Sequence, residues 1–138
     1  MSDAVLMDSG PLVAYLDKAE QFHDWTQARF QELSAPFLVP EAVLSEVCFL
    51  LADVPGGVAK VSDYLRRRLL VLTPVGAAAQ PRIFSMMAKY ESVPMSYADA
   101  CLLWLAETQP RSRVFTLDSD FSIYRLDRSR AVPVIAPF

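Results

Sequence analysis

Short apolar segments alternate with segments of helical composition along the whole chain, and this alternation narrows the possible folds more than any other feature. The strand-like segments are residues 4–8, 36–40, 69–75, 113–118 and 131–137. The helix-like segments are residues 9–16, 21–33, 41–52, a stretch from Gly56 to the Arg run at 66–68, a helix within 77–91, and a helix that Ser96 opens. Strands that alternate with helices indicate βαβ units with right-handed crossovers. We therefore predict a three-layer α/β/α sandwich with a central, mostly parallel sheet.

Length and composition indicate one compact domain that leaves apolar surface for a partner. The 138 residues suffice for a single domain over 1–138 with a substantial core. Hydrophobic residues make up 53% of the chain and charged residues 21%, which excludes a disordered chain. Because so much of the sequence is apolar, we expect an oligomer, and a homodimer in particular.

The sequence contains no segment that would place it in a membrane or a secretion pathway. The longest near-apolar runs, 47–52 and 101–106, are far shorter than the roughly 18 residues of a membrane span. Asp3 stands where a signal peptide would carry Lys or Arg. We therefore expect a cytoplasmic protein with no membrane association.

Several classes of binding site are absent from the sequence. The four glycines form neither GxGxxG nor GxxxxGK[ST], so no phosphate-cradling loop is visible. Cys48 and Cys101 form no CxxC pair and only His23 could assist them, which argues against structural zinc. The net charge of −3 excludes a strongly basic nucleic-acid-binding domain, but ten of the thirteen basic residues are Arg, which suits a local phosphate-binding patch as well as a solvated surface.

Four acids occupy positions where a charge is unexpected. Asp8 and Asp118 each follow an apolar, strand-like run, so both are expected at the carboxyl edge of the sheet, where ligands bind in such folds. Glu46 lies in helix 41–52 among apolar neighbours three and four residues away, so its charge is expected on a buried face. Asp99 likewise has apolar residues one turn away in the helix that Ser96 opens. All four carboxylates are thus expected to point inward with no nearby Lys or Arg to compensate them.

A bound divalent cation would compensate these charges. Mg²⁺ and Mn²⁺ take oxygen ligands, and Mg²⁺ is often held by one or two carboxylates together with a substrate phosphate. Such ions activate water and stabilise the leaving oxygen of a phosphodiester. The acids therefore favour metal-dependent phosphodiester hydrolysis.

Each acid except Glu46 also has a structural explanation. Asp99 stands three residues after Ser96, as in a helix capping box. Asp8, and Asp118 with Asp120, are typical turn residues. A mid-helix Glu46 caps nothing, and the conjunction of four acids favours the functional interpretation. His23, Trp25 and Trp104 are interpreted as packing residues without a catalytic role.

The motifs VLMDSGPLVAYLD, PEAVLSEV, SYADACLLWLAE and VFTLDSDF resemble the PIN-domain family, in the right order and over essentially the whole chain. The resemblance implies a parallel-sheet sandwich with a Mg²⁺- or Mn²⁺-dependent nuclease site, and many small members look like VapC-type toxins that cleave RNA. By position, the family's three core acids match Asp8, Glu46 and Asp99. Its fourth acid matches Asp118, with Asp120 as an auxiliary acid. Ser9 matches a hydroxyl residue that supports the site.

The function that this resemblance implies is a metal-dependent endoribonuclease, the toxin of a type II toxin–antitoxin pair. The four acids would hold the metal, and nearby Arg side chains would hold the RNA backbone. A small antitoxin protein would inhibit by filling an apolar groove and placing a basic side chain among the acids. The alternative is a catalytically silent PIN-like module that binds RNA or protein, against which the presence of all four acids counts.

Overall fold

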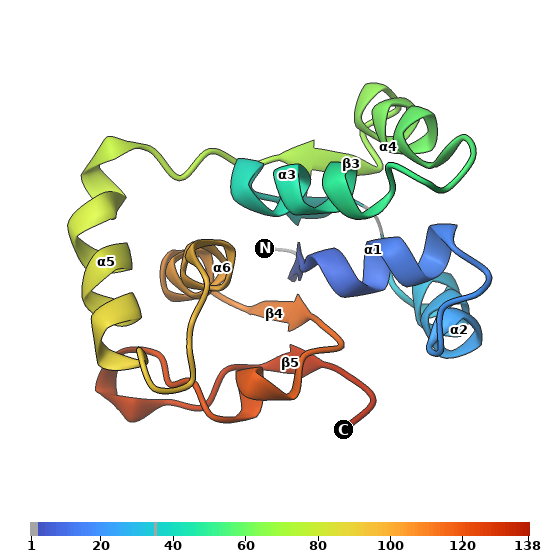
Figure 1. The fold of residues 1–138 in the computed structure, drawn as a ribbon. Coiled ribbons are helices and arrows are strands. Elements are labelled where there is room, and N and C mark those ends of the chain that lie inside the picture. The colour runs from blue at the N-terminus through green and yellow to red at the C-terminus, as the bar shows by residue number, and fades with distance from the viewer. Residues whose placement is uncertain (1–2, 35) are drawn as a thin grey trace.

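A computed structural model describes residues 3–34 and 36–138, in which five strands form one sheet (Figure 1). The strands are β1 (Ala4–Met7), β2 (Phe37–Val39), β3 (Leu70–Leu72), β4 (Ser112–Phe115) and β5 (Val134–Ile135). They are ordered β3-β2-β1-β4-β5, and all four neighbouring pairs are parallel. The predicted α/β/α sandwich with a parallel sheet is therefore confirmed, and β5 is an edge strand as expected.

Six α-helices and three short 3₁₀ helices connect the strands. The α-helices are α1 (Ser9–Leu16), α2 (His23–Glu32), α3 (Glu41–Leu50), α4 (Gly57–Arg66), α5 (Gln80–Lys89) and α6 (Tyr97–Thr108). The 3₁₀ helices are η1 (Ala77–Ala79), η2 (Ser119–Ser122) and η3 (Asp127–Ser129). Helix α1 contacts α2 and α3, while α5 packs against α6, which in turn contacts β1 and β4 (Figure 1). None of the helices in the described part of the chain has the length and apolar character needed to cross a bilayer.

Local sequence signals explain where the helices begin. The Asp8 side chain caps α1, and Pro11 stands in the first turn, where its missing N–H costs no hydrogen bond. Gly56 precedes α4 with a φ of 73°, a left-handed conformation that glycine adopts without strain. Ser96 caps α6 with a complete capping box. These signals fix the residues at which α1, α4 and α6 begin.

The strand order creates a crevice beside β1. From β1 the chain moves to β2 on one side of the sheet, and it later returns to β4 on the other side of β1. Ligands of open parallel sheets bind at such a reversal of strand order, beyond the carboxyl ends of the strands. We therefore expect a binding site at the carboxyl ends of β1 and β4.

One expectation about helix α3 is wrong. Because its neighbours three and four residues away are apolar, Glu46 was expected on a buried face, but two of these neighbours are at the surface, Phe49 with 80% and Leu50 with 52% exposed. Only Val43 and Val47 of this helix are fully buried. The helix meets α1 and α6 along one side, so the apolar residues on its other side remain at the surface and Glu46 is half-buried.

The three residues interpreted as packing residues behave as expected. The Trp25 ring lies 6.1 Å from the Phe115 ring, and Trp104 packs half-buried against the core. Nδ1 of His23 lies 2.7 Å from the carbonyl oxygen of Ala14, which anchors the start of α2 to α1. None of these three residues contributes to the cavity that Asp8, Asp99 and Asp118 line.

Candidate active site

All the acids selected from the sequence line one cavity. This cavity, of about 460 Å³, lies beyond the carboxyl ends of β1 and β4. The side chains that matter for its chemistry are Asp8, Ser9, Glu46, Asp99, Asp118 and Asp120. Among the described residues that line it there is no Lys, Arg or His. The structure thus brings five carboxylates together without a compensating cation from the protein.

Asp8 is the buried member of the group, with 5% of its surface exposed. Its Oδ1 accepts a hydrogen bond from the Ser9 backbone N–H at 2.8 Å, and its Oδ2 accepts one from the Thr116 hydroxyl at 2.7 Å. Burial, and to a smaller extent the charges of Asp99 and Glu46, raise the pKa of Asp8 to about 7, and the two hydrogen bonds oppose this rise. In the absence of a cation, Asp8 therefore keeps its proton in much of the population at neutral pH.

Glu46 is held by a residue of another helix. The Ser9 hydroxyl on α1 donates a hydrogen bond to Glu46 Oε1 on α3 at 3.0 Å. Ser9 therefore links Asp8, through its backbone N–H, to Glu46, through its side chain. This geometry suits the supporting role that the family resemblance implied for Ser9.

Asp99 caps its helix and also faces the cavity. Its backbone N–H donates to the Ser96 hydroxyl at 3.0 Å, and the Ser96 N–H donates to Asp99 Oδ2 at 3.3 Å, which completes the capping box. The Tyr124 hydroxyl donates to the same Oδ2 at 3.0 Å. Burial raises the pKa of Asp99, and the charge of Asp118 adds to the effect. The capping and functional interpretations of Asp99 therefore do not exclude each other.

Asp118 and Asp120 lie at the rim. Asp118 Oδ1 accepts a hydrogen bond from the Asp120 N–H at 2.9 Å and so caps η2, as the turn interpretation expected. Asp118 is exposed, so the expectation that all four carboxylates point inward is wrong for this residue. The physical reason is that the η2 turn stands beyond the end of β4 in contact with solvent. Asp120 is half-buried, and both residues remain alternatives for the fourth acid.

Two residues that support the acids were missed from the sequence. Thr116 is fully buried, and its hydroxyl accepts from the Asp118 N–H at 3.0 Å while donating to Asp8. Its position, as a polar residue within an apolar run and two residues before Asp118, was a usable signal. Tyr124 gave no such signal, because a Tyr among apolar residues is ordinarily a core residue.

The donor set fits a hard divalent ion, although the ligand sphere is not preformed. The cavity offers carboxylate and hydroxyl oxygens only, and Asp8 and Asp99 carry raised pKa values that a nearby cation would lower. Within residues 3–34 and 36–138, no three His, Cys, Asp or Glu side chains already stand in an arrangement that could hold a metal ion. Carboxylates repel one another when no cation lies between them, so the charges favour an open arrangement.

Several of the Arg side chains bind groups away from the acid cavity. Arg66 and Arg67 pair with Asp63 on α4, and Arg130 pairs with Asp127. Arg125 Nη1 donates to three backbone carbonyls, those of residues 122–124. None of the described Arg residues lines the acid cavity, so the structure does not place the expected phosphate-binding patch at the acids.

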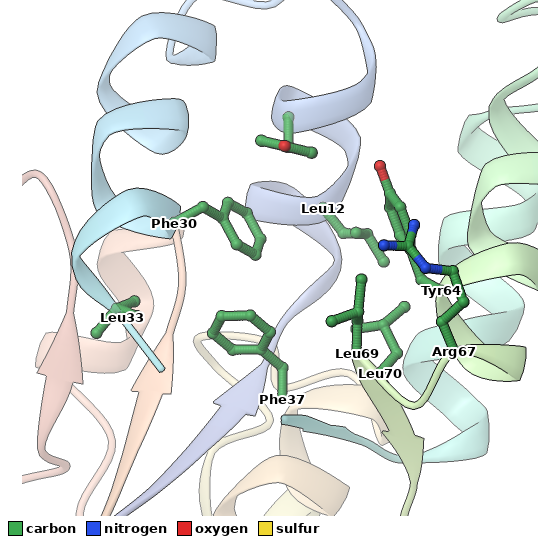
Figure 2. A pocket seen from close by; sticks show the side chains of 9 residues that line it. Leu12, Phe30, Leu33, Phe37, Tyr64, Arg67, Leu69 and Leu70 are labelled. Atoms are coloured by element: carbon green, nitrogen blue, oxygen red, sulfur yellow. The ribbon is translucent and has the colours of Figure 1, made fainter. Parts of the chain in front are cut away.

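A second cavity, apolar and of about 380 Å³, lies apart from the acids between α1, α2, α4 and the sheet (Figure 2). The rings of Phe30 and Phe37 form one wall, with centroids 5.0 Å apart. On the other side lie Tyr64 of α4 and Arg67, which directly follows this helix. The cavity thus combines an apolar floor with a cation at its edge.

Comparisons with known proteins agree with this geometry. A search of curated proteins finds no significant match, whereas the family model "PIN domain" matches residues 5–127. The structure of Mycobacterium tuberculosis VapC20, described as a sarcin-ricin loop cleaving toxin, has a TM-score of 0.75 and 16% identity over 87% of this chain and 94% of that chain. A chain of the DNA-bound VapBC complex from Salmonella typhimurium has a TM-score of 0.66 and 11% identity over 98% of each chain. The chain therefore belongs to the PIN-domain family.

Proposed function

We propose that this protein is a Mg²⁺- or Mn²⁺-dependent endoribonuclease that acts in the cytoplasm as the toxin of a toxin–antitoxin pair. The observation that carries the proposal is the convergence of five carboxylates, with no protein cation among them, beyond the ends of β1 and β4. The likeness of the fold to a toxin described as cleaving the sarcin-ricin loop supports RNA as the substrate. Oxygen ligands and a phosphodiester substrate suit a hard divalent ion.

The acids have distinct tasks in this proposal. Asp8, Glu46 and Asp99 hold the ion, and either Asp118 or Asp120 completes the site. An ion held by these residues would supply an activated water and would stabilise the charge that develops on the phosphate. Asp8 gives up its proton when the ion binds, because its pKa near 7 falls beside a cation.

We further propose that the cavity of Figure 2 receives a segment of a small antitoxin protein. Its lining by Leu12, Phe30 and Phe37 favours apolar side chains on that segment. The likeness to a chain of the VapBC complex supports a partner of this kind. A basic side chain further along the partner would neutralise the acid cavity.

A homodimer also belongs to the proposal. Phe84 on α5 and Tyr97 on α6 form an exposed aromatic pair, with ring centroids 5.9 Å apart. Tyr97 directly follows Ser96, a residue that lines the acid cavity. A second copy that covers this pair would bring two acid cavities toward one RNA-binding surface.

Cleavage of a mixed cellular RNA pool tests the enzymatic proposal. We expect the wild-type protein to cut RNA in Mg²⁺ or Mn²⁺ and not in EDTA, and Asp99→Asn to abolish cutting because it removes a ligand charge. Asp53→Asn, the same change at an exposed position outside the cavity, serves as the control and should cut like the wild type. Cutting in EDTA, or full activity in Asp99→Asn, would contradict the proposal. A wild-type protein that binds Mn²⁺ but cuts no RNA would favour the silent binding module.

A further inference from the structure

Tyr124 connects the apolar core to the acid cavity. The residue is fully buried, and its ring packs against Tyr90 and Phe121 with centroid separations of 5.2 Å in both cases. A buried Tyr hydroxyl requires a hydrogen-bond partner. Here that partner is a carboxylate of the candidate site, because the hydroxyl donates to Asp99 Oδ2 at 3.0 Å.

Tyr124 also belongs to the segment that carries the rim acids. Its backbone N–H donates to the Asp120 carbonyl at 3.2 Å, and the Asp120 N–H donates to Asp118 Oδ1 at 2.9 Å. A single continuous set of hydrogen bonds therefore runs from Asp118 through Asp120 and Tyr124 to Asp99 on α6. The placement of the α6 acid relative to the two rim acids depends on the Tyr124 hydroxyl.

The two hydrogen bonds to the Asp99 carboxylate differ in origin. The bond from the Ser96 N–H, at 3.3 Å, is part of the capping box and would form on any helix that begins with this motif. The bond from Tyr124 comes from a different element and lies in a rigid aromatic cluster. Both bonds end on Oδ2, so Oδ1 is the oxygen available to a ligand in the cavity.

We propose that Tyr124 is a positioning residue that holds Asp99 Oδ2 and thereby presents Oδ1 to the divalent ion. The inference rests on the proposed metal-dependent function and adds a residue to it that contacts neither ion nor RNA. Groups that hydrogen-bond to metal ligands fix the ligand orientation, and their loss typically costs about 10- to 100-fold in metal affinity or activity.

The test compares Tyr124→Phe with Tyr90→Phe. Both changes remove one hydroxyl from the same aromatic cluster, but the Tyr90 hydroxyl accepts from the Arg125 backbone N–H at 2.9 Å and touches no acid. Mn²⁺ affinity is measured by titration calorimetry on the full chain without RNA. We expect Tyr124→Phe to weaken Mn²⁺ binding about 10- to 100-fold and Tyr90→Phe to change it less than about twofold. Cleavage by Tyr124→Phe should recover at high Mn²⁺ concentration.

The double variant with Asp99→Asn separates positioning from general damage to the fold. If Tyr124 acts through Asp99, adding Tyr124→Phe to Asp99→Asn causes no further loss of Mn²⁺ affinity. Equal weakening by the two Tyr→Phe changes, or wild-type affinity in Tyr124→Phe, overturns the inference and leaves the proposed function standing. Absence of Mn²⁺ binding by the wild-type protein overturns the proposed function and this inference with it.

Discussion

At the scale of single residues, Asp8 is a carboxyl group whose ionised form is less stable in the folded protein than in water. Its folded-state pKa of about 7 lies above the 3.8 of an unperturbed Asp, chiefly because the side chain is buried. Between these two values the folded protein retains a proton that the unfolded chain has released. The free energy of unfolding of the metal-free protein therefore falls as pH rises, by up to about 1.4 kcal/mol per pH unit, until Asp8 is ionised in both states.

Asp8→Asn removes this pH dependence, because an amide does not ionise. In EDTA we expect the unfolding free energies of the wild type and Asp8→Asn to differ little near pH 4 and to diverge up to pH 8. The variant should gain roughly 2 to 4 kcal/mol relative to the wild type over this range. Urea unfolding at a series of pH values measures both curves. Parallel curves from pH 4 to 8 would show that the folded protein does not raise the pKa of Asp8.

Adding excess Mn²⁺ tests the ionisation of Asp8 a second time, through the difference in unfolding free energy between the wild type and Asp8→Asn. An ion that takes the ionised carboxylate stabilises the folded wild-type protein by mass action, so the gap to Asp8→Asn should narrow at pH 8. At pH 5, where Asp8 retains its proton, the same ion should narrow the gap less.

The acids and Ser9 could be found from the sequence, and Thr116 left a usable signal, whereas Tyr124 could not be found. A carboxylate directly after an apolar strand, such as Asp8, or within an apolar helix, such as Glu46, is unexpected among its sequence neighbours. Such a residue can therefore be recognised from the sequence alone. Tyr124 conflicts with nothing locally. Its role arises from the hydrogen bond to Asp99, which is 25 residues away in the sequence. Thr116 and Asp8, which are also hydrogen-bonded, are 108 residues apart. Contacts at such separations depend on strand order, which the sequence pattern restricts but does not fix.

At the scale of secondary-structure elements, the predicted segments were correct in type and order. Apolar runs marked the five strands, and capping residues marked the starts of α1 and α6. The outer strands were predicted too long, since β3 covers Leu70–Leu72 and β5 only Val134–Ile135. An edge strand pairs on one side only, and its length is set by its neighbour rather than by its own composition.

Glu107 fastens α6 to two neighbouring elements. Arg82 of α5 donates to both of its oxygens, at 3.1 and 2.7 Å, and the Asp127 N–H of η3 donates at 2.9 Å. The Glu107 side chain is only 10% exposed. We expect Glu107→Ala to lower the free energy of unfolding by about 1.5 to 3 kcal/mol, the range for hydrogen bonds to charged groups, as measured by urea denaturation.

The exposed pair of Arg29 and Glu32 gives a matched comparison. Its 2.8 Å ion pair is made by a Glu side chain that is 62% exposed, so Glu32→Ala should cost less than about 1 kcal/mol. Neither variant touches the acid cavity, so RNA cleavage per folded molecule should stay at the wild-type level. Equal destabilisation by the two changes would contradict the view that Glu107 joins α5, α6 and η3.

At the scale of the whole molecule, one side of the structure combines acids with uncovered apolar surface. The acid cavity lies beyond the ends of β1 and β4, and Glu46 and Ser96 also border a shallow hollow that Tyr97 lines. Tyr97 is 37% exposed and Phe84 is 58% exposed. Exposed aromatic side chains beside a polar site are typical of an interface between chains.

Phe84→Asp should therefore separate the proposed dimer. Phe84 is largely exposed, so the change removes little core packing but places a charge at the centre of the proposed contact. Light scattering should give the wild type about twice the 15.4 kDa chain mass and Phe84→Asp a mass close to that of one chain. Val58→Asp, at a 43% exposed apolar position on α4, should leave the mass of the wild type unchanged. A wild-type protein that has the mass of one chain at every concentration tested would reject the dimer, and an unchanged mass in Phe84→Asp would place the interface on another face.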